Sequence, residues 1–76
     1  MELYQAEWCP HSHRVREKLT DLQLDFLARQ VPPDEEDRDE MELETGCREI
    51  PTLVTDGGGI LSGEDDILDY LDRVRA

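Results

Sequence analysis

The sequence predicts an α/β protein whose elements follow in the order β-α-β-α-β-β-α. A short apolar stretch at the start is followed by a longer one in which apolar residues recur at helical spacing, and then by a second short stretch. Near the end, two short apolar segments flank a glycine-rich turn, and a last amphipathic stretch follows. Because strands joined by a βαβ crossover are parallel and the crossover is right-handed, we predict a mixed four-stranded sheet flanked by three helices.

The first half of the chain supplies a strand, a helix and a second strand. Glu2–Gln5 is the predicted first strand, and a helix follows over about Pro10–Leu22. Leu24–Val31 alternates imperfectly and is the predicted second strand. Three side chains at helical spacing form the apolar face of the helix: Val15, Leu19 and Leu22.

A second helix is predicted after the break at Pro32-Pro33. It should span about Asp34–Thr45, because aspartate is a good N-cap and acidic residues favour the first turn of a helix. Gly46 is expected to end it. The only apolar side chains inside this helix are Met41 and Leu43, so we expect it to pack lightly.

The last third supplies two strands and the final helix. Ile50–Val54 is the predicted third strand, Asp56–Gly59 a turn and Ile60–Leu61 a short fourth strand. Ser62 is expected to cap the last helix, with Asp65 three residues later in a variant of the capping box. Helical spacing predicts a buried stripe of four residues: Ile67, Leu68, Leu71 and Val74.

The length of 76 residues is that of one small domain, and we expect residues 1–76 to form it as a monomer. No apolar run is long enough to cross a bilayer, and no basic segment followed by an apolar one marks a secretory signal. Two cysteines do not make a disulfide framework. These features indicate a protein of the reducing cytoplasm.

The charge is strongly negative. Twenty acidic residues face eight basic ones, which gives a net charge of −12 and disfavours binding to nucleic acids or anionic membranes. Seven of the eight cations are arginines. Two explanations stay open: a halophilic protein whose acidic surface stays hydrated in concentrated salt, and an acidic protein that docks on a basic partner. The spread of acids along the chain favours the first.

Cys9 is the strongest candidate for a reactive residue. It lies where the first strand gives way to a helix, directly before Pro10, which suits a first helical turn. The free N–H groups and the positive dipole end of a helix stabilise a thiolate, the form that attacks disulfides. Ser12 stands where a C-x-x-C pair has its second cysteine and is predicted to donate a hydrogen bond to the thiolate. The alternative is a small buried residue at a helix start.

Three segments together resemble the thioredoxin fold, and more narrowly glutaredoxins and the thioredoxin-like N-terminal domains of glutathione S-transferases. Residues 9–16, C-P-H-S-H-R-V-R, are similar to transferase domains with a cysteine active site. Residues 45–51, T-G-C-R-E-I-P, resemble the T-G-x-R-x-V-P segment of glutaredoxins. Residues 63–71 resemble both the G-x-D-D segment of glutaredoxins and the E-S-x-A-I-x-x-Y-L segment of transferases. The implied order is βαβ–α–ββα. The sequence lacks the all-helical second domain of the transferases, which favours a stand-alone glutaredoxin-like protein unless the chain is an excised fragment.

The resemblance also implies a binding site for glutathione or a related γ-glutamyl thiol. A cis Pro51 would bring the backbone of Ile50 beside Cys9, where it would pair with the cysteinyl part of the thiol. Backbone N–H groups near Glu64 and Asp65 would bind the γ-glutamyl carboxylate, and Asp65 its ammonium group. Helix capping alone is the other explanation for these two acids. The remaining implied positions are Trp8, which would flank the site as a packing aromatic, Pro10, Arg48 and Gly63.

The implied activity is thiol–disulfide exchange by one cysteine, so the chain is predicted to be an enzyme of the glutaredoxin type. Its partners would be a small thiol and proteins that carry disulfides or mixed disulfides. No metal is expected, because His11 and His13 lie two residues apart on a helix and point to different sides. Two alternatives stay open: an iron–sulfur cluster carrier of the monothiol glutaredoxin type and a redox-silent interaction module.

One position departs from the glutaredoxin pattern. Many glutaredoxins carry a cation three residues before the nucleophile, where this chain has Ala6 followed by Glu7. Arg48 is predicted to supply part of the missing positive charge. Cys47 is expected to be a small structural residue.

Overall fold

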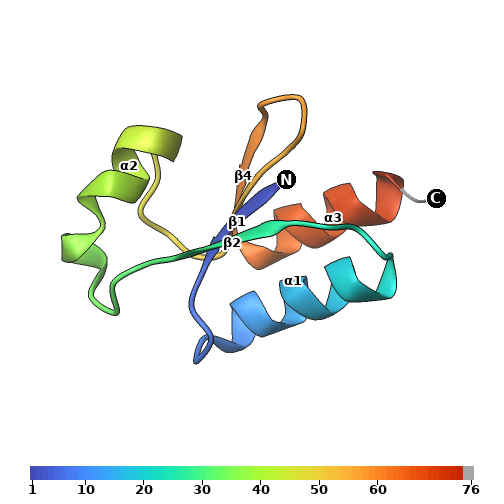
Figure 1. Ribbon diagram of the computed structural model, residues 1–76, viewed down its shortest axis with the longest axis horizontal. Helices are drawn as coiled ribbons and strands as arrows, with labels where there is room; N and C mark the ends of the chain where they lie inside the picture. Colours follow the sequence, from blue (N-terminus) through green and yellow to red (C-terminus); the bar gives the residue numbers. More distant parts are fainter. Residues whose placement is uncertain (75–76) are drawn as a thin grey trace.

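The computed structural model describes residues 1–74. It confirms the predicted class: one mixed sheet of four strands and three α-helices, in the predicted order (Figure 1). The elements are β1 (Glu2–Gln5), α1 (Pro10–Asp21), β2 (Leu27–Gln30), α2 (Asp39–Thr45), β3 (Thr52–Val54), β4 (Ile60–Ser62) and α3 (Glu64–Val74). Among the described residues, no helix is both long enough and apolar enough to span a membrane.

The sheet has the strand order β2-β1-β3-β4. β1 and β2 are parallel, as the crossover rule predicted, while β1–β3 and β3–β4 are antiparallel. Because β1 and β2 run in the same direction, the segments that follow them leave the sheet at the same end. These segments are the loop that leads to Cys9 and the Pro32-Pro33 break.

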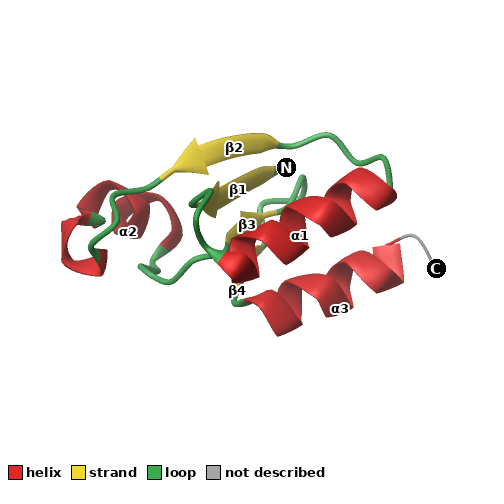
Figure 2. Ribbon diagram, turned by 90° about the horizontal axis from the view of Figure 1, so that it is seen from below, coloured by secondary structure: helices red, strands yellow, loops and turns green. Residues whose placement is uncertain are grey.

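The core lies on one face of the sheet. α1 and α3 run side by side and cover this face (Figure 2). Burial of their aliphatic side chains against the strands is the main source of stability in such a small domain. Val74, predicted to belong to the buried stripe, is instead 46% exposed in the last turn of α3. The fully buried cluster consists of Leu3, Val15, Leu19, Leu53, Ile67 and Leu71.

The segment between β2 and β3 differs from its prediction as one continuous helix. A short 3-10 turn at Glu35–Asp37 comes first, and Arg38 separates it from α2. Arg38 is only 6% exposed, because its guanidinium turns inward and donates hydrogen bonds to three backbone carbonyl groups. The break in the helix therefore has a cause, the burial of one arginine. The acceptors, at 2.9 to 3.0 Å, are the carbonyl oxygens of Pro32, Pro33 and Arg48.

The α2 helix is anchored by one apolar side chain and not by two. Met41 is buried, whereas Leu43 is 87% exposed. α2 lies beyond the end of the sheet and does not cover its second face (Figures 1 and 2). Gly46 ends α2 in the left-handed conformation, with φ of +77°, as predicted.

Three boundaries shift from their predicted positions. β2 is four residues long, and all of them are exposed, since this strand lies at the edge of the sheet. β3 begins at Thr52, after a cis peptide bond between Ile50 and Pro51. Ser62 does not cap α3, because it belongs to β4, where its hydroxyl accepts a hydrogen bond from Thr52 Oγ1 at 3.1 Å. Gly63, with φ of +94°, takes the capping position instead.

Candidate active site

Cys9 is held at the junction between β1 and α1. Its backbone is extended, with φ of −81° and ψ of 120°, and its carbonyl oxygen accepts the first helical hydrogen bond, from His13 N–H at 3.0 Å. Pro10 takes the first helical position, where a missing N–H leaves no acceptor unpaired. Cys9 is therefore the N-cap of α1, and an N-cap side chain faces the free N–H groups of the first turn.

The surroundings of the Cys9 thiol favour the thiolate. Burial raises the pKa of Cys9, but the N–H and hydroxyl groups of Ser12, the N–H of His11 and the charge of Arg16 outweigh it, so the pKa lies below its ordinary value. Ser12 is itself fully buried, and its Oγ accepts a hydrogen bond from Ala6 N–H at 3.4 Å. That contact leaves the hydroxyl proton available to the sulfur.

Arg16 is the cation that acts on Cys9, and the sequence analysis did not single it out. Its Nη1 donates to the carbonyl oxygen of Ala6 at 3.3 Å, and the N–H of Cys9 donates to the same oxygen at 3.2 Å. A hydrogen bond to Gln5 Oε1 fixes the guanidinium, which also faces Glu7 at 3.5 Å. The sequence does contain a signal for this contact. Position 16 follows position 9 by two helical turns, so the two residues lie on the same face of the helix.

Arg48, the predicted source of positive charge, is engaged elsewhere. Its guanidinium pairs with Asp39 and with Glu42, 3.0 Å from Glu42 Oε2, and these carboxylates raise the pKa of Arg48. It also donates to the carbonyl oxygens of Glu35 and Glu36, both at 3.1 Å. Arg48 thus joins α2 to the 3-10 turn, because the acid-rich segment offers it several carboxylates at once.

A shallow hollow of about 360 Å³ brings together most of the predicted thiol-binding residues. Its wall includes His11, which belongs to the first turn of α1, two residues after Cys9. The backbone N–H of Gly63 donates to the carbonyl oxygen of Pro51 at 2.9 Å, which ties the start of α3 to the start of β3. The Ile50–Pro51 peptide bond is cis, as the resemblance implied. The predicted residues in the wall are Ile50, Pro51, Gly63, Glu64 and Asp65.

The Glu64 side chain joins the first turns of α1 and α3. Arg14 binds it through Nε and Nη2, the latter 2.8 Å from Oε1, and His11 Nδ1 lies 2.6 Å from the same oxygen. These two partners lower the pKa of Glu64 to about 2. Asp65 is exposed and forms no ion pair within residues 1–74, as is also true of Glu49 and Asp66 in the same wall, so its binding of an ammonium group stays a prediction. Only the spacing of His11 and Arg14, one helical turn, hinted at this contact in the sequence.

Trp8 and Cys47 contribute little to the buried structure around Cys9. Trp8 is 64% exposed and so is not packed into the protein, and its predicted position beside a bound thiol stays a prediction. It lies in the turn before α1, where the small Ala6 and Cys9 are the buried residues. Cys47 is half-buried, and its Sγ donates to the carbonyl oxygen of Thr45 at 3.7 Å. Both thiols are free.

The histidines near Cys9 are turned toward carboxylates. His11 contacts Glu64, and His13 Nε2 lies 3.5 Å from Glu17 on the next turn of α1. In the part of the chain from 1 to 74, no three histidine, cysteine, aspartate or glutamate side chains are grouped so that they could hold a metal ion.

The fold and the site define a class of protein. It is a thioredoxin-like domain in which a cysteine of lowered pKa is the N-cap of α1 and a cis-proline segment lines the hollow beside that helix. Comparison with known families agrees. A family model described as "Glutathione S-transferase, N-terminal domain" matches residues 3–76. The chain belongs to this family of glutathione-related domains.

Solved structures show the same fold. Glutathione S-transferase 1-6 from Anopheles dirus species B has a TM-score of 0.86 at 22% identity, and a glutathione S-transferase domain-containing protein from Marinobacter aquaeolei has 0.79 at 22%. Both are matched by 100% of this chain, which covers 36% and 39% of theirs. For a glutathione S-transferase from Rhodospirillum rubrum the TM-score is 0.82 at 27% identity, with 97% of this chain and 33% of that one covered. A search of curated proteins found no match.

Proposed function

We propose that this domain is a thiol–disulfide oxidoreductase that uses Cys9 as its single reactive cysteine and glutathione or a related γ-glutamyl thiol as co-substrate. The observation that carries the proposal is the position of Cys9 as the N-cap of α1, with Ser12 and Arg16 lowering its pKa. The thiolate is the species that disulfide exchange requires, and a lowered pKa increases its share at a given pH. We place this activity in the reducing cytoplasm, in a monomer formed by residues 1–76.

The exchange would proceed in two steps. The Cys9 thiolate attacks the sulfur of the small thiol in a mixed disulfide with a substrate protein. A new S–S bond forms between Cys9 and the small thiol, and the protein sulfur leaves with the electron pair and takes up a proton. A second small thiolate then attacks the small-thiol sulfur bound to Cys9. The disulfide of two small thiols leaves, and the Cys9 thiolate is restored.

The hollow beside α1 would hold the small thiol. The backbone of Ile50 offers N–H and C=O groups to its cysteinyl part, in the manner of strand addition. Free N–H groups at the start of α3 suit the γ-glutamyl carboxylate, and the carboxylate of Asp65 suits the ammonium group. The Glu64 carboxylate, already bound by Arg14 and His11, would shape this end of the hollow.

The test is reduction of a glutathione mixed disulfide, coupled to glutathione reductase and measured at low and at high potassium chloride. Cys9→Ser should abolish turnover, while Cys47→Ser, the matched control, should retain most of it. Loss of turnover in Cys47→Ser alone would replace the single-cysteine route with a cycle between the two cysteines. A brown, iron-containing preparation would favour a cluster carrier, and an inactive wild type an interaction module.

A second candidate is favoured by the family match. A glutathione transferase holds the small thiol as a thiolate so that it attacks an electrophile, and the cysteine then only stabilises that thiolate. One variant, Cys9→Ser, distinguishes the transferase from the oxidoreductase. Cys9→Ser would keep conjugation of glutathione to chlorodinitrobenzene if the domain is a transferase, because the serine hydroxyl still donates a hydrogen bond. It would lose disulfide reduction under the lead proposal.

A further inference from the structure

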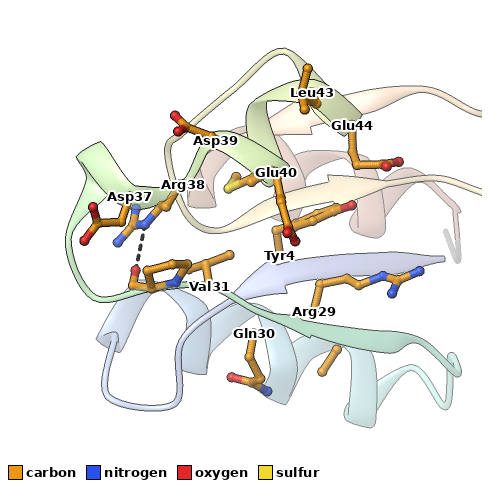
Figure 3. A pocket seen from close by; sticks show the side chains of 13 residues that line it. Tyr4, Arg29, Gln30, Val31, Asp37, Arg38, Asp39, Glu40, Leu43 and Glu44 are labelled. Atoms are coloured by element: carbon orange, nitrogen blue, oxygen red, sulfur yellow. Dashed lines mark hydrogen bonds between the residues drawn. The ribbon is translucent and has the colours of Figure 1, made fainter.

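A second and larger hollow, of about 830 Å³, lies between β2 and α2 (Figure 3). It shares no wall residue with the hollow beside α1. Side chains of β2, such as Arg29, line one wall, and side chains of α2, such as Glu40 and Glu44, line the other. Tyr4 lies between these walls. The volume is in the range of sites that hold a ligand or several side chains of a partner.

The wall of this hollow keeps a net negative charge after the ion pairs and hydrogen bonds of its arginines are taken into account. Its two cations are already engaged, since Arg29 pairs with Glu2 at 2.7 Å and Arg38 donates to three backbone carbonyl groups. Asp39 pairs with Arg48. Three wall carboxylates remain without an ion-pair partner within residues 1–74: Asp37, Glu40 and Glu44.

Tyr4 places an unused polar group in the same hollow. Its side chain is more than nine-tenths buried, at 8% exposure, yet its hydroxyl makes no hydrogen bond with any residue from 1 to 74. Burial raises the pKa of Tyr4, and Glu44 and Glu2 raise it further against the opposing charge of Arg29, so the phenol keeps its proton. The ring is buried, but the hydroxyl reaches the open space of the hollow, since Gln5 Nε2 is the one fully buried polar side-chain atom without a hydrogen-bond partner in residues 1–74. The Tyr4 hydroxyl can therefore donate a hydrogen bond to a group that enters the hollow.

The exposed edge of β2 borders this hollow. β2 pairs with β1 alone, and the N–H of Leu27 donates to the carbonyl oxygen of Met1 at 2.9 Å. Successive residues of a strand direct their backbone groups to opposite edges, so Arg29 also faces β1. Ala28 and Gln30 therefore direct their N–H and C=O groups outward, toward the open side of the sheet. Such an edge is a template for another extended chain.

From these observations we infer that the hollow is a docking site for an extended, lysine- or arginine-bearing segment of a partner protein, which adds to the sheet as a strand beside β2. Its backbone pairs with Ala28 and Gln30. Alternate side chains of the segment point into the hollow, where their cationic ends meet Glu40 and Glu44 and lie against Tyr4. The net charge of −12 opposes a second copy of this chain as the occupant, since the two copies would repel each other.

The first test measures affinity with a labelled eight-residue peptide of alternating threonine and lysine, by fluorescence anisotropy in dilute buffer. The double variant Glu40→Gln/Glu44→Gln should weaken binding about fivefold, the scale of two exposed ion pairs. Asp21→Asn/Asp69→Asn removes the same charge from two exposed residues outside the hollow and should leave affinity nearly unchanged. Equal weakening in both double variants would overturn the site, because binding would then depend only on the overall charge.

The second test locates the contact by amide hydrogen exchange. Addition of the peptide should slow exchange of the Ala28 and Gln30 N–H groups and change those of Leu27 and Arg29 little, since these already face β1. Cys9→Ser should bind the peptide as the wild type does, so the inference can fail or stand independently of the proposed redox function. Unchanged exchange at Ala28 and Gln30, or spermidine binding as tight as the peptide, would overturn strand addition. Loss of peptide binding in Cys9→Ser would also overturn the inference, because it would show that the peptide binds at the cysteine and not in the hollow between β2 and α2.

Discussion

The pKa of Cys9 depends on Arg16, a cation two helical turns away. Arg16→Gln removes the charge of Arg16, so the pKa of Cys9 should rise. The pH dependence of iodoacetamide alkylation measures this directly, as an upward shift of the midpoint. Arg73→Gln, an exposed change on α3 with the same effect on net charge, should leave the midpoint in place. Equal shifts in both variants would show that overall charge, and not Arg16, sets the thiol pKa.

Gln5 holds the Arg16 guanidinium in place, but its own buried amide lowers the stability of the fold. It is fully buried, its Oε1 accepts from Arg16, and its Nε2 has no hydrogen-bond partner within the described residues. An unpaired buried donor costs about 1–3 kcal/mol. Gln5→Leu should therefore raise the pKa of Cys9 without lowering the free energy of unfolding, as alkylation and urea denaturation would show. A clear loss of stability would mean that the amide contributes more to folding than to the site.

At the level of elements, Glu64 couples the first turns of α1 and α3 in a pH-dependent way. Its folded-state pKa of about 2 lies below the usual carboxyl value of about 4.3, so the contact stabilises the fold fully above that value and is lost as pH falls toward 2. The stability difference between wild type and Glu64→Gln should be constant above about pH 5 and shrink between about pH 4 and pH 2. Urea midpoints across this range test it, with Asp69→Asn as the control. A difference that does not change with pH would mean that the ion pairs contribute nothing.

Arg38 is expected to hold the segment between β2 and β3 in place. Arg38→Gln would leave the carbonyl oxygens of Pro32, Pro33 and Arg48 without the guanidinium donors that bind them now. The expected loss is about 2–4 kcal/mol in the free energy of unfolding, from urea denaturation. Arg73→Gln should cost less than about 0.5 kcal/mol, as exposed substitutions usually do. Equal effects would mean that Arg38 does not brace this segment.

For the whole molecule, stability should depend on salt. The net charge of −12 stores repulsion, and the acid-rich segment 34–44 has Met41 as its only buried apolar side chain. The screening length falls from about 30 Å at 0.01 M salt to about 3 Å at 1 M, so concentrated salt weakens this repulsion. We expect the melting temperature to rise between about 0.05 M and 2 M potassium chloride, with α2 loosening first in dilute buffer. An unchanged melting temperature would remove the halophile hypothesis.

The sequence by itself determined the order of the elements and the position of the thiol. Three local signals predicted these features: helical spacing, the proline after Cys9 and the glycine after α2. Each acts on residues only a few positions away, so each can be recognised in the sequence. The cis proline at Pro51 followed from the resemblance to known families. Predictions that needed only neighbours along the chain were therefore confirmed for the order of the elements and for the end of α2 at Gly46. They were wrong for the start of that helix and for the cap of α3, and the ends of strands shifted.

The tertiary structure alone decided which charges meet. Arg48 was expected at the cysteine and lies instead against α2, while Arg16 takes that role. The Glu64 carboxylate meets Arg14, fifty residues earlier in the chain, and Arg38 breaks a helix that local signals favoured. The physical reason is that charges act through space: a side chain turns to whichever partner folding brings within a few ångströms, and sequence spacing does not reveal that partner.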